Sequence, residues 1–158
     1  HEAGKGIIVV VNKWDLIQKE TNTMRDFQRL IEAEMQFMSY APSLFISVKD
    51  KVRVKQVIDM ARAEAENRAM RVPTGQLNSL ISDATMMKQP PSDKGRRLKI
   101  YYVTQVGVKP PLFSFQINDR ELMHFSYARY LENKIREGYG FAGTSLKIVF
   151  REKGEKIE

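Results

Sequence analysis

The chain has 158 residues, enough for one large domain or two small ones, and its 42% hydrophobic and 28% charged residues are ordinary for globular proteins. It contains no cysteine, which excludes disulfides and thiolate metal sites and favours a reducing cytoplasmic location. With only two histidines, we expect no metal site. The longest apolar run, Ile7–Val11, is far too short to cross a bilayer, so we expect no membrane association.

The formal net charge of +7 is unevenly distributed. Residues 1–71 carry 12 Lys/Arg and 10 Asp/Glu, or +2, whereas residues 72–158 carry 14 and 9, or +5. The excess in the second half favours a polyanionic partner there, although a solvated basic surface without a partner is the alternative.

The first half alternates strand and helix patterns. Gly6–Val11 is a β-branched run without polar alternation, which predicts a central strand buried on both faces of a parallel sheet. Leu44–Ile46 is a second short strand. Two amphipathic helices are predicted, from Thr23 and from Val54 to Ala69, each with one buried face. Such alternation is typical of an α/β fold.

The pattern changes near residue 71, so we expect one domain at residues 1–71 and another at 72–158. In the second, Thr74 is expected to cap a helix, and a polar loop then joins that helix to a β-hairpin. A short helix, a longer helix and a last strand follow, giving an α+β order. The predicted ranges are helix 74–86, loop 88–97, strands 98–106 and 113–117, helices 120–123 and 126–139, and strand 146–150.

Asn12, Lys13 and Asp15 follow the first strand, at the sheet end where open α/β folds bind ligands. A carboxylate accepts two hydrogen bonds from adjacent N–H donors, and guanine offers such a pair whereas adenine does not. Asp15 is therefore the expected guanine selector. Lys13 can lay its stem along the base, and Asn12 can tie neighbouring loops together.

Ser47, Val48 and Lys49 come 32 residues after Asp15, at the end of the next strand. This second loop reaches the same sheet edge, where a backbone N–H could bind the guanine O6. The alternative is that Asn12–Asp15 is simply a polar turn after a strand.

Other residues of the second half suggest contact with RNA. A dense basic group can meet phosphates with little sequence dependence. Of four aromatic residues in the hairpin, we expect half to pack in the core rather than all to stack on bases. Gly140–Gly143 is expected to be a turn, and His124 and Phe125 a helix junction or part of the core. The basic group is Lys88, Lys94, Arg96, Arg97 and Lys99, and the aromatic residues are Tyr101, Tyr102, Phe113 and Phe115.

These motifs resemble a known family. Asn12–Asp15 with Ser47–Lys49 is similar to the fourth and fifth motifs of translation-factor-type GTPases, although Val48 stands where alanine is usual. Three later stretches resemble the Der (EngA) GTPases, which are bacterial ribosome-assembly proteins with two GTPase domains followed by a KH-like domain. Those stretches are Leu98–Tyr102, Lys109–Pro111, and Asn118-Asp119 with Leu122–Tyr127.

The resemblance implies part of a P-loop-GTPase-type parallel sheet followed by a KH-like domain, in a cytoplasmic GTP-binding protein that assembles the large ribosomal subunit. It implies GTP or GDP as ligand, large-subunit rRNA as partner, and contact with GTPase domains upstream. The sequence begins at His1 without a G-x-x-x-x-G-K-[ST] loop, so we expect a piece of a longer protein with no catalytic residue of its own. Mg²⁺ would need the upstream motifs. The alternative is a stand-alone RNA-binding module with a vestigial nucleotide fold.

Overall fold

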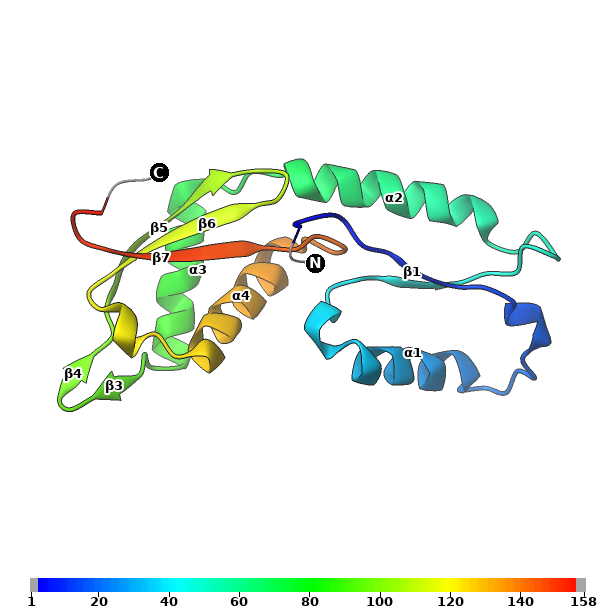
Figure 1. Ribbon diagram of the computed structural model, residues 1–158, viewed down its shortest axis with the longest axis horizontal. Coiled ribbons are helices and arrows are strands. Elements are labelled where there is room, and N and C mark those ends of the chain that lie inside the picture. Colours follow the sequence, from blue (N-terminus) through cyan, green and yellow to red (C-terminus); the bar gives the residue numbers. More distant parts are fainter. Residues whose placement is uncertain (1–2, 156–158) are drawn as a thin grey trace. The chain divides into compact units, whose positions relative to one another are not determined.

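The computed structural model describes residues 3–155, so residues 1–2 and 156–158 lie outside the described part. The chain divides into two compact units (Figure 1). The first comprises residues 1–68 and 141–145, and the second comprises residues 69–140 and 146–158. A short segment late in the sequence thus belongs to the first unit, which no local pattern indicates. None of the helices in residues 3–155 has both the length and the apolarity needed to cross a membrane.

The first unit contains the parallel pair of strands that the sequence predicts. Strands β1 (Val9–Val11) and β2 (Ser43–Phe45) pair with Val10 opposite Leu44. A short 3-10 helix, η1 (Trp14–Leu16), follows β1. The helices are α1 (Thr23–Glu34), the 3-10 turn η2 (Gln36–Met38) and α2 (Val54–Ala69).

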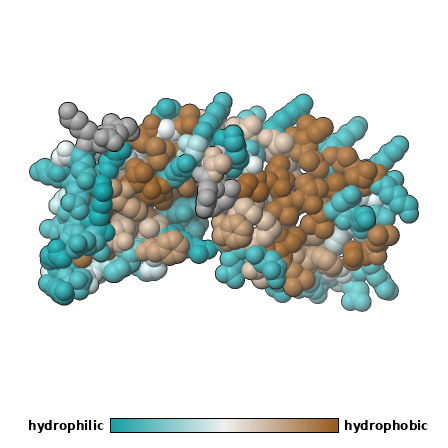
Figure 2. All heavy atoms as spheres, viewed as in Figure 1, coloured by the Kyte–Doolittle hydropathy of each residue, from teal (hydrophilic) through white to brown (hydrophobic). Residues whose placement is uncertain are grey.

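Two expectations of burial in this unit are wrong. The side chain of Val10 is 40% exposed, so the face of β1 that carries it is not fully covered, and β1 pairs with β2 alone among the described strands. Neither α1 nor α2 has a buried residue, and Leu30 and Ile58 are about 60% exposed (61% and 59%). Figure 2 shows the resulting apolar surface over the elements of this unit.

Residues 141–145 complete the first unit. The Ile7 N–H donates to the Gly143 carbonyl at 2.8 Å, and the Gly143 N–H donates to the Tyr40 carbonyl at 2.9 Å. The Thr144 hydroxyl, which is fully buried, donates to Glu64 Oε1 of α2 at 3.1 Å. The loop between residues 140 and 146 is therefore built into the first unit by backbone and side-chain bonds.

The second unit is a three-stranded sheet covered by two helices (Figure 1). Strand β5 (Ile100–Gly107) pairs antiparallel with β6 (Leu112–Ile117), which pairs parallel with β7 (Lys147–Glu152). Helices α3 (Thr74–Met87) and α4 (Phe125–Tyr139) pack on each other, and η3 (Arg120–Leu122) precedes α4. The predicted hairpin, helices and last strand are thus confirmed. The large, fully buried side chains of this core include Phe113, Phe115, Leu77, Leu131 and Ile135.

Details of the second unit differ from the prediction. Thr74 is the first residue of α3 rather than its cap, because Pro73 takes the N-cap position and no side chain caps the helix. The expected loop 88–97 contains a small hairpin, β3 (Ser92–Asp93) and β4 (Arg96–Arg97). Its two turn residues, Lys94 and Gly95, have φ of 48° and 79°, which is the backbone of a two-residue hairpin turn.

Candidate functional site

Two loops meet at the carboxyl ends of β1 and β2. The Ile46 N–H donates to the Val11 carbonyl at 2.8 Å, and the Trp14 N–H donates to the Ile46 carbonyl at 3.0 Å. These bonds extend the pairing of the strands into the loops. They bring Asn12–Asp15 beside Ser47–Lys49, as the sequence predicts for adjacent parallel strands.

Asp15 and Ser47 are joined directly. The Ser47 hydroxyl donates to Asp15 Oδ1 at 2.7 Å and accepts from the Asp50 N–H at 3.1 Å. The hydrogen bond from Ser47 lowers the pKa of Asp15, with smaller contributions from its own backbone N–H and from Lys49 and Lys19, although desolvation opposes them. The carboxylate is therefore held ionised in a fixed orientation, which suits an acceptor for two N–H donors.

Asn12 provides the second bridge between the loops. Its Oδ1 accepts a hydrogen bond from the Val48 N–H at 3.2 Å. A backbone N–H of the second loop is expected to bind guanine O6. If that donor is the Val48 N–H, it is already bound to Asn12 within the protein. A bound base would compete with Asn12 for this N–H.

Lys13 has a left-handed backbone, with φ of 62° and ψ of 31°. Such a conformation is uncommon for a residue with a side chain, and functional sites are where it concentrates. It leaves Lys13 exposed and turns the next residue inward. Lys49, in the facing loop, is also exposed.

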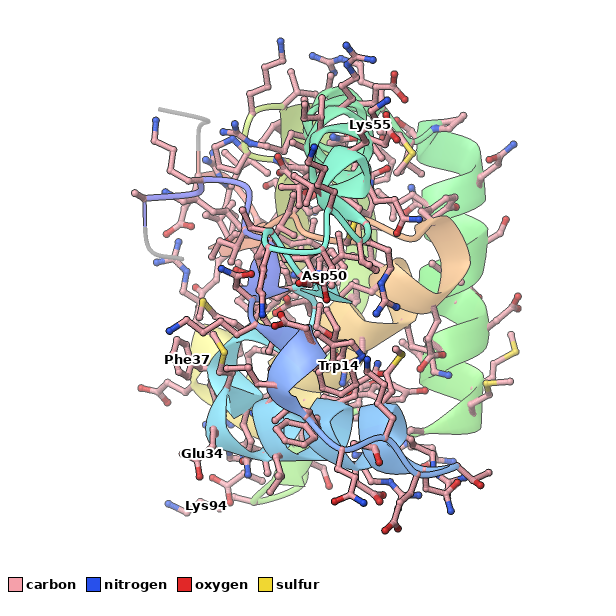
Figure 3. All side chains as sticks on the ribbon, turned by 90° about the vertical axis from the view of Figure 1, so that its right-hand side faces the viewer. Trp14, Glu34, Phe37, Asp50, Lys55 and Lys94 are labelled. Carbon is pink, nitrogen blue, oxygen red and sulfur yellow. The ribbon has the colours of Figure 1, made fainter. Side chains whose placement is uncertain are left out.

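Trp14 anchors the first loop, a role the motif alone does not indicate. It is only 4% exposed, and its ring lies 4.5 Å from that of Phe45 and 5.4 Å, edge-on, from that of Phe27 in α1. Figure 3 shows Trp14 against α1, with Asp50 marking the second loop. The sequence signal for this role is an aromatic residue inside an otherwise polar quartet, but that signal does not show which residues pack around the ring.

The five basic residues of the candidate RNA-binding group are not equivalent. Arg96 Nη1 lies 2.6 Å from Asp119 Oδ2, so this guanidinium is held by an acid. The ammonium of Lys88 lies 5.1 Å from the ring centre of Tyr130. Lys94, Arg97 and Lys99 are exposed, and the Lys94 side chain extends outward (Figure 3).

Asn118 fixes the base of the β3–β4 hairpin. Its Nδ2 donates to the Arg97 carbonyl at 3.0 Å, and its Oδ1 accepts from the Lys99 N–H at 2.7 Å. Asp119 meanwhile caps η3 by accepting from the Glu121 N–H at 2.9 Å. Neighbouring residues thus hold the basic hairpin against the end of β6.

The aromatic residues divide as expected. Phe113 and Phe115 are fully buried, whereas Tyr101 and Tyr102 are 56% and 46% exposed. Gly140 and Gly143 form turns with φ of 87° and 74°. His124 is the N-cap of α4 and Phe125 is 79% exposed, so these two form a helix junction and not part of the core.

The sequence is closely similar to proteins named GTPase Der. One from Alkaliphilus metalliredigens is 56% identical over 153 residues, covering 97% of this chain and 35% of the relative. One from Desulfitobacterium hafniense is 53% identical over 158 residues, covering 100% of this chain and 36% of the relative. The chain thus spans about a third of the length of these curated relatives.

A family match falls on the second unit. Residues 71–151 match the family described as the C-terminal KH-domain-like region of EngA bacterial GTPase enzymes. The match includes the three-stranded sheet, both packed helices and the basic hairpin. The chain belongs to this EngA (Der) GTPase family, in which residues 71–151 form the KH-domain-like C-terminal region.

Proposed function

We propose that the first unit recognises the guanine base of GTP and GDP, and that the chain acts as part of a cytoplasmic GTPase in assembly of the large ribosomal subunit. The observation that carries guanine recognition is the hydrogen bond between Ser47 and Asp15, supported by that between Asn12 and Val48. Asp15 would accept from the base N1 and N2, and Lys13 would cover its face. Adenine would leave the carboxylate unpaired, an error that costs about 10⁴ in selectivity at sites built around a polar match.

Catalysis is proposed for the longer protein. The relatives are named as GTPases and are about three times the length of this chain. Phosphate binding, Mg²⁺ and hydrolysis would require the upstream motifs absent from these 158 residues. In that protein, the upstream GTPase domains would contact this chain, whose residues would select the base.

Trp14 gives a direct test, because it is the only tryptophan and lies between Lys13 and Asp15. Its emission is recorded while the 158-residue chain is titrated with GDP or with ADP at millimolar concentrations. We expect a saturable change with GDP at concentrations where ADP has no effect. Equal responses to both nucleotides, or to neither, would contradict the proposal.

We further propose that the second unit contacts rRNA through its basic residues, namely Lys94, Arg97 and Lys99, with Lys88 and Arg96 contributing less. All five side chains are exposed, so the ranking is supported by the partners of the other two: Asp119 holds Arg96, and the Tyr130 ring lies beside the Lys88 ammonium. An RNA contact through these basic residues also fits the alternative function, an RNA-binding module with a vestigial nucleotide fold. The GDP and ADP titration separates these two readings.

The RNA contact is tested by charge reversal. Lys94→Glu with Arg97→Glu should weaken binding of rRNA fragments at low salt and reduce the salt dependence, because phosphate contacts release counterions. Lys5→Glu with Lys55→Glu makes the same change in net charge on the first unit and serves as the matched control. If both pairs of changes weaken binding equally, the contact is non-specific and the basic hairpin has no special role.

A further inference from the structure

A groove runs between α3 and the edge strand β5. Two cavities, of about 650 and 290 Å³, share Thr85, Ile100 and Tyr101 as lining residues, so they are continuous. Met86, Arg97 and Lys99 line the first cavity, and Ser82 and Tyr102 line the second. This groove lies along β5, on the opposite sheet edge from β7.

A β-bulge exposes two consecutive tyrosines in this groove. The register of β5 against β6 shifts between Ile100, opposite Ile117, and Tyr102, opposite Gln116, which leaves Tyr101 as the extra residue. In a regular strand, neighbouring side chains point to opposite faces, and one tyrosine would be directed away. The bulge instead leaves both rings accessible to one groove.

The charge of the groove is one-sided. Arg97 and Lys99 are its charged lining residues, and none of the described residues that line either cavity is acidic. Accessible aromatic rings beside cations form the combination that binds unpaired nucleic-acid bases, through stacking and phosphate contacts.

A sheet edge can also bind a peptide as an added strand. Asn78 disfavours this alternative because its side chain already binds the backbone of β5. Its Oδ1 accepts from the Val103 N–H at 3.0 Å, and its Nδ2 donates to the Val103 carbonyl at 2.8 Å. The backbone groups that would bind a new strand at this position are already paired. The groove is therefore suited to a ligand bound through side chains.

We propose that this groove binds single-stranded RNA, with Tyr101 and Tyr102 stacking on adjacent unpaired bases and Arg97 and Lys99 contacting the phosphates beside them. The proposal rests on the RNA contact proposed above and adds which face is used and which form of RNA is bound. Stacking surfaces tolerate any base, so sequence preference should be weak.

The test is fluorescence anisotropy with an oligoribonucleotide of about ten adenosines and with a duplex of the same length. We expect the single strand to bind more tightly than the duplex. Tyr101→Leu and Tyr102→Leu should each weaken single-strand binding about tenfold, whereas Tyr101→Phe and Tyr102→Phe retain the ring and should retain affinity. Both positions are exposed, and circular dichroism would verify that the variants fold.

Salt dependence separates stacking from charge. The leucine variants should keep the wild-type slope of log affinity against log salt, whereas Arg97→Ala and Lys99→Ala should each reduce it by about 0.7, the value for one phosphate contact with a single strand. Phe125→Leu is the matched control, because Phe125 is exposed and lines a different cavity beside β7.

Three results would overturn this inference. The first is that the two leucine variants bind the single strand as tightly as wild type. The second is that Phe125→Leu loses affinity and the tyrosine variants do not. The third is that the protein prefers duplex RNA. In each case the chain still binds RNA, so the proposed RNA contact survives. Absence of binding to either RNA at low salt would defeat both the inference and the proposed contact.

Discussion

The contact between Ser47 and Asp15 determines how the candidate guanine site is oriented. Asp15 could be assigned from sequence, because a carboxylate after a parallel strand is an accessible acceptor. Its hydroxyl partner comes from 32 positions away. The spacing of the two loops predicts their proximity, but not which atoms bond. For Trp14, the side-chain packing that orients the loop becomes evident only once Phe27 and Phe45 are placed around it.

Ser47→Ala should raise the pKa of Asp15 toward its ordinary value of 3.8, because the Ser47 hydroxyl is the largest cause of the lowering. A lowered pKa in the folded state stabilises the protein above the unfolded pKa, and this contribution is lost as the pH falls through the folded pKa. The variant should lose less stability than wild type as the pH falls below 3.8.

The measurement is an NMR titration of the Asp15 carboxyl carbon. Ser39→Ala, which removes an exposed hydroxyl elsewhere in the first unit, is the control and should leave the titration unchanged. An unchanged Asp15 titration in Ser47→Ala would show that the hydroxyl does not hold the carboxylate.

The order of helices and strands in the second unit follows closely from the sequence, since apolar periodicity and turn residues agree there. The β3–β4 hairpin was not predicted, because its strands are two residues long and carry no alternation. The bulge at Tyr101 was not predicted either, because a register shift depends on the partner strand. In the first unit, the predicted burial of one face of α1 and of α2 is wrong. An amphipathic pattern shows that a helix has a face suited to burial, but it does not show whether another element covers that face.

Gly143→Ala should destabilise the first unit by about 1–3 kcal/mol. Gly143 has a φ of 74°, and an added Cβ would lie 2.7 Å from Glu64 Cγ and 3.1 Å from the Ile7 carbonyl oxygen. The measurement is hydrogen exchange of the Ile7 amide, which is bound to Gly143.

Gly75→Ala is the matched control, because Gly75 lies in α3 and an added Cβ there meets nothing within 4 Å. Alanine is the better helix former, so this change should stabilise the second unit by up to about 1 kcal/mol. If Gly143→Ala leaves exchange at Ile7 unaltered, the segment 141–145 is not an integral part of the first unit.

The two units differ in how completely they bury their apolar side chains. The second has a closed core of fully buried aromatic and aliphatic side chains, whereas the first exposes large apolar side chains on its strands and helices (Figure 2). Contiguous apolar surface of this kind marks sites of association. The exposed side chains include Val10, Met24, Leu30, Phe37 and Ile58.

The isolated chain should therefore self-associate with rising concentration. Leu30→Glu with Phe37→Glu should reduce this association without unfolding the protein, because both side chains are more than 60% exposed, at 61% and 63%. Sedimentation velocity over a range of concentrations is the measurement. A wild-type chain that stays monomeric throughout would show that the apolar face does not drive association.

The central claim is that Asp15 selects guanine, and two-dimensional NMR tests it even at millimolar affinity. In the wild-type chain, GDP should shift the Trp14 indole and the Val48 and Lys49 amide signals, whereas ADP should shift them far less. In Asp15→Asn, this difference between the nucleotides should disappear, because the carboxylate that pairs with the two guanine N–H groups is gone. An equal preference for GDP in Asp15→Asn and in wild type would contradict the account.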